Sequence, residues 1–451
     1  MIATYDERRR AGRSLRTSVP RSAHRIWGGL FAPRDPVAVL EAQAESREAD
    51  LVPIRYGRMA ASPFAFFRGG AAIMAQDLAT GPVTGLAVQA CGDAHVNNFG
   101  KFATPERNVV FDINDFDETF PGPWEWDVKR LCASLHVVGL STGLAPAQRD
   151  RVVATAALAY RERMAEFASM RTLERWYGTI HIEDVIAHFP PEFRPTVRRD
   201  VRKAERKDHV RAVDRLTTTV DGHARFRNDP PLLVHLSGTD ADMDDVFPMI
   251  EQYRESLTDE RRDLFDRFRV VDVARKVIGV GSVGTRCRVV LFEGPDHPEG
   301  DRLVLQVKEA QASVLQPYVD IAPPEHQGRR VVEGQRRTQA ASDLFLGWCE
   351  GPRTGRQYYV RQLWDVKGQS DPMAMGVNNL SYYGALCAWA LARAHARTGD
   401  PVQISGYLGK GAAFDRAIVG FSADYAVTNE QDHQAFLAAI EDGRIEALDG
   451  R

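Results

Sequence analysis

Residues 90–118, ACGDAHVNNFGKFATPERNVVFDINDFDE, constrain the fold more than any other part of the chain. Two apolar runs, 86–91 and 108–113, have the composition of strands, and ATPER supplies turn residues between them. Polar side chains cluster where both runs end. They are Asp93, His95, Asn97 and Asn98 after the first run, and Asp112, Asn114, Asp115, Asp117 and Glu118 within or after the second. Asp and Asn are poor strand residues but good oxygen ligands for Mg²⁺, so the segment predicts a site for magnesium and phosphate groups.

The alternative is that these side chains only form turns, because Asn and Asp start turns without any chemistry. Carboxylates crowded beside apolar strands raise the electrostatic energy unless a cation or a proton offsets it. This crowding favours a cation site over plain turns.

Composition sets the outer bounds. A chain of 451 residues with 44% apolar content can bury a large core and is expected to divide into two or three lobes. The net charge of -3 gives no reason to expect nucleic acid or a membrane surface as a partner. Five widely spaced cysteines predict neither a zinc site nor a disulfide framework. With no apolar run long enough to span a bilayer and no leader-like start, we expect a cytoplasmic protein.

The first 180 residues carry further signals. Residues 1–35 are rich in arginine and predict an arm that wraps the protein or is partly disordered. Helical spacing follows at 35–47, and 62–79 places Arg68 beside two glycines at the opening of a predicted helix, where it is either an anion contact or a partner for the crowded carboxylates. A buried helix entered at Pro123 carries Asp127 in its first turn. An acid in so apolar a stretch needs a hydrogen-bond partner.

After about residue 268 the sequence pattern changes from helical to β-rich. Three β-rich runs, ending at Ile278, Phe292 and Lys308, are separated by glycines. Gly279, Gly281 and Gly284 form GxGxxG, with Ser282 inside it, but no helix follows, which argues against a dinucleotide-binding fold. The lysine that ends the apolar strand LVLQVK must point its ammonium at an anion or at solvent. Residues 194–228 are basic and predict a solvated helical face, or a dock for an acidic partner.

These pieces resemble protein kinases and aminoglycoside-type phosphotransferases. GVGSVG (279–284) looks like their glycine-rich loop, and VLQVK (304–308) looks like the strand whose lysine holds phosphates. GDAHVNN (92–98) is similar to the catalytic loop GDxHxxN. The resemblance implies a catalytic role for Asp93, Asn98 and Asp112, metal binding by Asn98, Asp112 and Asp115, contacts to ATP through Gly279, Gly281, Ser282, Gly284, Lys308, Glu333 and Arg68, and structural support from His95 and Asp127. Glu333 is the acid expected to pair with Lys308.

The chain as a whole resembles a bacterial family of unknown function, DUF2252, in FFRGG, GDAHVNNFG, FDINDFDE and WDVKRL. Because the catalytic and metal segments precede the glycine loop, the reverse of the order in kinases, the resemblance implies a circular permutation. The expected fold is α+β, a two-lobed kinase-like fold with a small antiparallel β lobe and a larger helical lobe. The expected divisions are an N-terminal arm and helix (1–60), a lobe with the catalytic loop (61–265), a β-rich nucleotide lobe (266–368) and C-terminal helices (369–451).

The resemblance implies an ATP- and Mg²⁺-dependent phosphotransferase acting on an unknown hydroxyl acceptor. Asp93 would accept the proton of the acceptor, and Asn98 and Asp112 would hold Mg²⁺. Asp115, Asp117 and Glu118 are left over, which allows a second metal or a cationic substrate. Three alternatives stay open: transfer of AMP on the same scaffold, a metal-dependent phosphoesterase, and a nucleotide-binding module without catalysis. The oligomeric state is not predicted.

Overall fold

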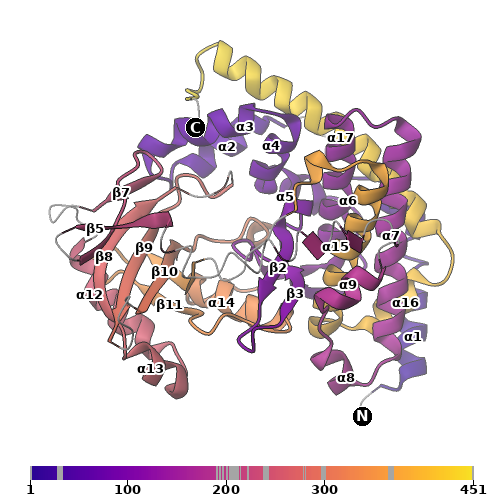
Figure 1. The fold of residues 1–451 in the computed structure, drawn as a ribbon. Coiled ribbons are helices and arrows are strands. Elements are labelled where there is room, and N and C mark those ends of the chain that lie inside the picture. The colour runs from indigo at the N-terminus through magenta and orange to yellow at the C-terminus, as the bar shows by residue number, and fades with distance from the viewer. Residues whose placement is uncertain are drawn as a thin grey trace.

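A six-stranded sheet and a group of long helices form the two sides of the molecule (Figure 1). The computed structural model describes residues 3–27, 34–188, 215–220, 223–236, 243–277, 281–295, 301–363 and 370–448, together with positions 191, 194, 195, 198, 199, 202, 213 and 279. The chain is therefore of mixed α+β class, as expected.

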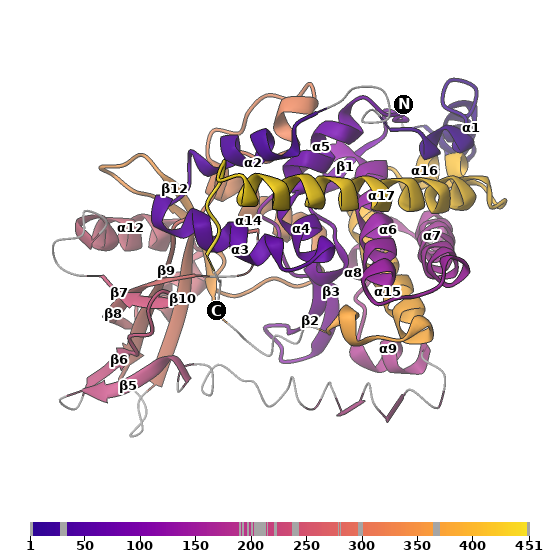
Figure 2. The ribbon, with the colours of Figure 1, turned by 90° about the horizontal axis from the view of Figure 1, so that it is seen from above.

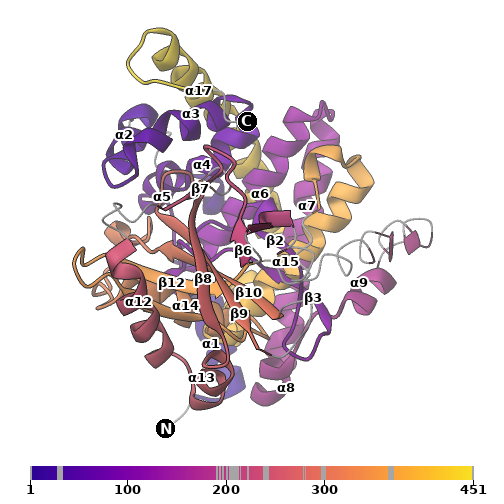
Figure 3. The same ribbon diagram turned by 60° about the vertical axis from the view of Figure 1, so that its left-hand side comes forward.

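The sheet is antiparallel throughout and has the order β11-β12-β10-β9-β8-β7. Its strands are β7 (Leu233–His235), β8 (Arg269–Lys276), β9 (Cys287–Gly294), β10 (Asp301–Glu309), β11 (Gly347–Glu350) and β12 (Gln357–Gln362). The three β-rich runs predicted after residue 268 correspond to β8, β9 and β10. In Figure 3 the sheet comes forward, with these three strands side by side.

Both faces of the sheet are covered. Helices α12 (Met243–Glu255) and α13 (Asp259–Phe265) pack on one face, where Tyr253 and Phe265 meet apolar residues of β8, β9 and β10. The hairpin of β5 (Thr217–Val220) and β6 (His223–Phe226) packs on the other. The division expected at residue 265 does not follow this packing, since α12 and α13 share a core with the sheet. Residues 194–228 were expected to form a solvated helical face. The end of this range instead forms the hairpin of β5 and β6, and most of its other residues lie outside the described residues.

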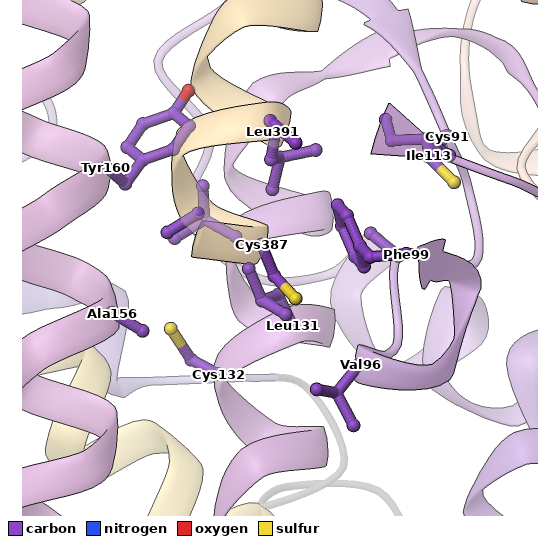
Figure 4. Close-up of a cluster of buried hydrophobic side chains, with 14 of the residues drawn as sticks. Cys91, Val96, Phe99, Ile113, Leu131, Cys132, Ala156, Tyr160, Cys387 and Leu391 are labelled. Carbon is purple, nitrogen blue, oxygen red and sulfur yellow. The ribbon is translucent and has the colours of Figure 1, made fainter. Parts of the chain in front are cut away.

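The helical side surrounds one large apolar core. Its helices are α6 (Trp124–Ser141), α7 (Pro146–Ser169), α8 (Thr172–Tyr177), α9 (Ile182–His188), α15 (Val377–Thr398), α16 (Pro401–Leu408) and α17 (Ala413–Glu441). Helix α15 packs along α7, and α6 packs against both. Figure 4 shows Cys132 on α6 and Cys387 on α15 within this core, and all five cysteines are buried and unpaired.

Four short strands flank the loops that carry the predicted polar side chains. β1 (Ala87–Ala90) pairs with β4 (Phe120–Pro123), and β2 (Phe99–Ala103) pairs with β3 (Val109–Ile113). The ATPER turn therefore closes a hairpin of β3 with a strand that the sequence did not predict, FGKFA. The predicted strand 86–91 lies in a different ladder.

Several helix boundaries differ from those predicted. Residues 62–79 form two helices, α4 (Pro63–Gly69) and α5 (Ala71–Ala79), so that Arg68 lies in the last turn of α4 and does not open a helix. The resemblance to kinases implies a small-lobe helix at 334–348, but the helix in this part of the chain is α14 (Gln327–Thr338). It begins earlier because the His326 side chain accepts a hydrogen bond from the Arg329 N–H. The sequence predicts two helices near the end of the chain, at 411–423 and 430–442. The structure has a single helix there, α17, which spans the helical side in Figure 2.

The N-terminal part of the chain wraps the molecule, as predicted. Helix α1 (Tyr5–Ser14) crosses α16, where Arg8 pairs with Asp400 at 2.6 Å. Helices α2 (Pro36–Ala44) and α3 (Val52–Ala60) lie with α4 between the sheet and the helical side (Figure 1). Among the described residues, no helix has the length and apolar character needed to cross a bilayer.

Candidate functional site

A cavity of about 1280 Å³ lies where the sheet, the N-terminal helices and the loops after β1 and β3 meet. Most of the predicted site residues line it. These are Arg68, Asp93, His95, Asn98, Asp115, Gly279, Gly281, Ser282 and Lys308. Asp112, Asp127, Gly284 and Glu333 are not among its lining residues. The structure thus brings together residues far apart in the sequence.

The loop that follows β1 is held from below by α6. The Asp127 carboxylate accepts hydrogen bonds from the backbone N–H groups of Cys91 and Gly92 at 2.7 and 2.9 Å, and it lies 3.0 Å from Nε2 of His395. Gly92 has φ +81°, and a Cβ there would lie 2.3 Å from the carbonyl oxygen of Glu118. Glycine is therefore required for the close approach of the two polar segments. Asp127 thus lies beneath this loop and makes the backbone contacts that its predicted supporting role requires.

Asp93 and Asn98 face the cavity from the same loop. Arg130 of α6 donates to one Asp93 oxygen, with Nε at 2.9 Å, while Nε2 of His95 lies 3.7 Å from the other. Burial raises the pKa of Asp93, and Arg130 partly offsets this effect. The Asn98 amide donates to the Asp93 carbonyl at 2.7 Å, which fixes its orientation. Burial lowers the pKa of His95 well below its ordinary value, so its ring is neutral at pH 7 and has a structural place in the loop.

The structure does not place Asp112, which was predicted to bind metal and to act in catalysis, at the cavity. Asp112 lies inside β3, is buried, and forms an ion pair with Arg393 of α15. Its other oxygen accepts the backbone N–H of Ile113 at 2.9 Å. Arg393 also donates to the Thr338 carbonyl at 3.0 Å. A strand interior directs this carboxylate into the core, where it neutralises a buried arginine.

The carboxylates that reach the cavity come after β3. Lys308, at the end of β10, pairs with Asp117, and its ammonium donates to Ser282 Oγ at 2.7 Å. The Tyr359 hydroxyl donates to Asp117 at 2.7 Å. Burial opposes ionisation of Asp117, but Lys308 outweighs it and lowers the pKa of Asp117. Burial and the neighbouring Asp117 raise the pKa of Asp115, which would be relieved by a cation in the cavity.

Glu333 does not pair with Lys308. It lies on the outer face of α14 and pairs with Arg329 at 2.6 Å and Arg337 at 3.2 Å. The same helix instead directs Arg330 inward, where its guanidinium donates to the backbone carbonyl of Asp117 at 2.8 Å. The acid that holds the lysine is therefore Asp117, and α14 supports that acid through Arg330.

The glycine turn at 279–284 closes one end of the cavity. Gly279 has φ +66° and Gly284 has φ +86°, values that favour glycine. The N-terminal segment holds the turn through its carbonyls: Arg58 donates to Gly279 O at 2.6 Å and Arg47 to Val283 O at 2.5 Å. Positions 278 and 280 lie outside the described residues.

The donor set at the cavity fits Mg²⁺ better than a metal that needs a complete protein cage. Asn98 and Asp115 supply an amide and a carboxylate oxygen, and the buried Oδ1 of Asn114 has no hydrogen-bond partner. In the described part of the chain, no three His, Cys, Asp or Glu side chains form a cluster that could hold a metal alone. Mg²⁺ often takes only one or two carboxylates and completes its shell with water and substrate phosphates.

Comparison with protein families gives one match. The model of a family described as an uncharacterized protein conserved in bacteria, DUF2252, matches residues 47–439. The chain belongs to the DUF2252 family. No curated protein and no solved structure matches it. The matched range of the DUF2252 model includes every residue described above as lining the cavity.

The DUF2252 cavity is richer in basic than in acidic side chains. Among the described residues, ten Lys or Arg side chains and five Asp or Glu side chains line it, although the whole chain has a net charge of -3. The basic residues are Arg47, Arg55, Arg68, Arg198, Arg199, Arg202, Arg215, Lys276, Lys308 and Arg361. This imbalance favours ligands that carry several negative charges.

Sequence reasoning missed the arginines that organise this DUF2252 site. Arg130 and Arg393 lie in the apolar helices α6 and α15, and both hold a carboxylate of the central segment. A lone arginine in a buried helix is itself a signal, because its charge needs a partner. Arg47 gave no comparable signal, since its surroundings in the sequence are polar, whereas Arg55 lies in the apolar stretch LVPIRYG and carries the same signal.

Proposed function

We propose that the protein is an ATP- and Mg²⁺-dependent phosphotransferase acting on a hydroxyl acceptor. The observation that carries this proposal is the contact between Lys308 and Asp117, 191 residues apart, in a cavity that also contains Asp93 and Asn98. A lysine from a sheet, a glycine turn beside it and carboxylates on the opposite wall are the parts that phosphoryl transfer requires.

The proposed role of each residue follows from its position in the cavity. Lys308 and the glycine turn would hold the phosphates on the sheet side, with Ser282 beside the ammonium. Asp93 would accept the proton of the attacking hydroxyl, because its carboxylate faces the cavity and Arg130 fixes its orientation. Asn98 and Asp115 would hold Mg²⁺, which neutralises phosphate charge when it is bound. Of the two carboxylates predicted to bind the metal, Asp115 thus stays in the proposed metal site and Asp112 does not.

The proposal includes a circularly permuted kinase-like fold. Such a permutation needs the helix that precedes the catalytic loop in kinases to end beside the strand that leads into the loop. The backbone N–H of Gln89 in β1 donates to Thr398 Oγ1, at the end of α15, at 3.1 Å, although 309 residues separate them. A Cβ on Gly399 would lie 2.6 Å from Val88. This closeness supports a permuted connection.

Binding and transfer are tested separately. We expect an ATP analogue to bind in the presence of Mg²⁺, and Lys308→Ala to weaken that binding without unfolding the chain. Incubation of a bacterial lysate with the protein and either γ-labelled or α-labelled ATP then identifies the reaction. Label from the γ-phosphate supports phosphoryl transfer, whereas label from the α-phosphate would establish AMP transfer by the same site. Absence of Mg²⁺-dependent nucleotide binding would contradict both.

A further inference from the structure

Three arginines from the first 70 residues line the cavity without an acidic partner. Arg47 follows α2, Arg55 lies in α3 and Arg68 lies in α4. Among the described residues, no Asp or Glu forms an ion pair with any of them. Buried charges in proteins are ordinarily paired, since an isolated ion is costly to remove from water.

Backbone and amide oxygens satisfy only part of this cluster. Arg55 is 0% exposed and donates from Nη2 to Gly69 O at 3.1 Å and Gln43 Oε1 at 3.2 Å, which leaves Nε and Nη1 buried without a partner. Nε of Arg47 and Nε of Arg68 are also buried and unpartnered. Burial lowers the pKa of all three arginines, and the positive charge of Arg47 contributes to the effect on Arg55. An anion in the cavity would relieve both the desolvation and the repulsion.

Within the cluster, Arg47 contacts the glycine turn at Val283 O, whereas the charges around Arg68 distinguish it from the proposed phosphate site of the sheet. Lys308 and Ser282 are engaged with Asp117, whereas Arg68 interacts electrostatically with Asp93 and Asp115. The acceptor hydroxyl has to reach Asp93 in the proposed reaction. A guanidinium near that carboxylate is therefore suited to hold a charged group on the acceptor.

We propose that Arg47, Arg55 and Arg68 form an anion-binding subsite that receives a phosphate or carboxylate group of the acceptor. The existence of the subsite stands on the unpartnered guanidinium groups, and its assignment to the acceptor rests on the proposed function. Guanidinium matches both groups, because its planar donors form two parallel hydrogen bonds to phosphate or carboxylate oxygens. The substrate class is then a small hydroxyl compound that already carries a negative charge.

Calorimetric titration of the full chain with inorganic phosphate, and in parallel with acetate, tests the subsite. Each titration is made with and without saturating Mg²⁺ and a non-hydrolysable ATP analogue. We expect at least one anion to bind while the analogue is present, and Arg47→Gln and Arg68→Gln each to weaken it by about tenfold or more, as for a lost hydrogen bond to a charged group. Arg163→Gln, on the surface of α7, is the matched control and is expected to bind like the wild type.

Several outcomes would overturn the inference. Unchanged anion affinity in the Arg47 and Arg68 variants, or no anion binding at all, would remove the subsite. Competition between the anion and the analogue would assign the arginines to the nucleotide and remove the acceptor assignment. If the nucleotide does not bind but anion binding still depends on these arginines, the proposed function fails and the subsite stands. Arg55→Gln is a further variant, and the partly exposed Arg47 and Arg68 carry the test if that variant does not fold.

Discussion

Asp112 and Asp115 lie three residues apart but differ in what neutralises their charge. The Asp112 carboxylate pairs with Arg393, which is 1% exposed in the core. We expect Asp112→Asn to lower the free energy of unfolding by about 3–5 kcal/mol, because it leaves the buried guanidinium without a counter-charge. Urea denaturation measures this loss. A decrease below about 1 kcal/mol, the scale of an exposed ion pair, would show that the pair is not buried in solution.

Asp115→Asn is expected to act on binding and to leave the fold intact. The Asp115 carboxylate is crowded by Asp117, and this repulsion and burial raise its pKa, so that removing its charge costs the folded chain little. The variant is expected to lose the Mg²⁺ dependence of nucleotide binding while its urea midpoint stays near that of the wild type. Calorimetry at several Mg²⁺ concentrations measures the effect. Wild-type Mg²⁺ dependence in this variant would remove Asp115 from the metal site.

Glu118 gives a pH dependence of stability. Burial raises its pKa from 4.5 to about 7, while the unfolded chain keeps the ordinary value. Between these values the folded chain holds a proton that the unfolded chain has lost, so the free energy of unfolding falls as the pH rises. The side chain of Glu118→Gln can still accept the hydrogen bond from the Val314 N–H. Because it does not titrate, it removes the fall in the free energy of unfolding. The free energy of unfolding of the variant, relative to that of the wild type, is therefore expected to rise between pH 4.5 and 7. The rise is up to about 3 kcal/mol, at about 1.4 kcal/mol per pKa unit.

Urea denaturation at pH 5 and pH 8 measures the gain from Glu118→Gln. The exposed Glu106 provides the control, since Glu106→Gln is expected to change stability equally at both pH values. An advantage of the Glu118 variant that does not grow between pH 5 and pH 8 would contradict a neutral carboxyl at this position.

The sequence identified the residue types of the site better than their exact positions. Asp112 follows the apolar Phe111 and Asp115 follows Asn114, and metal binding was predicted for both carboxylates, with the catalytic role given to Asp112. The pairing of β2 with β3 determines which of the two carboxylates reaches the cavity. It places Asp112 opposite Gly100 inside a ladder and leaves Asp115 beyond the end of that ladder. The strand β2 was not predicted, since Gly100 and Lys101 interrupt its apolar pattern.

At the scale of elements, the segment from Arg47 to Arg58 holds the glycine turn. Leu51, Ile54, Val277 and Val283 form a small apolar cluster beneath the carbonyl contacts, and Val283 is 0% exposed. We expect Val283→Ala to weaken this attachment by about 2 kcal/mol, from two lost methyl groups and the cavity they leave.

Hydrogen exchange measures this attachment. Backbone amides of residues 281–286 are expected to exchange faster in Val283→Ala, while those of β10 keep their protection, because the change is local. Arg58→Gln, which removes only the side-chain contact to Gly279, is expected to have a smaller effect. Equal acceleration in β10 would mean that the turn does not open as a separate unit.

Tertiary contacts also explain why the predicted elements differ from those observed. Residues 424–429 lie between the two helices predicted at 411–423 and 430–442, and they were not predicted to be helical. Instead, the Tyr425 hydroxyl donates to Asp77 at 2.9 Å and the Asn429 amide to the Pro63 carbonyl at 3.0 Å. These buried contacts favour one continuous α17, and they involve residues more than 300 positions away that no local pattern reveals.

At the scale of the molecule, the site joins two separate cores. Lys308 belongs to the sheet and its apolar cluster, whereas the loop after β1 belongs to the core of the helical side. A ligand that touches both must therefore stabilise both against unfolding. A ligand bound only by the native state contributes RT ln(1 + [L]/Kd), about 2.7 kcal/mol at a hundredfold excess over Kd.

We expect a non-hydrolysable ATP analogue with Mg²⁺ to raise the melting temperature and to slow hydrogen exchange both in β9 and β10 and in residues 91–99. Lys308→Ala removes the contact on the sheet side and is expected to abolish the slowing in β9 and β10 first. Arg163, which is not among the residues that line the cavity, again supplies a control variant, Arg163→Gln, that keeps the wild-type response. Protection confined to one side would mean that the ligand does not bridge the cavity. The Lys308–Asp117 pair would then be a structural ion pair, and this result would contradict the proposed binding of a nucleotide by Lys308.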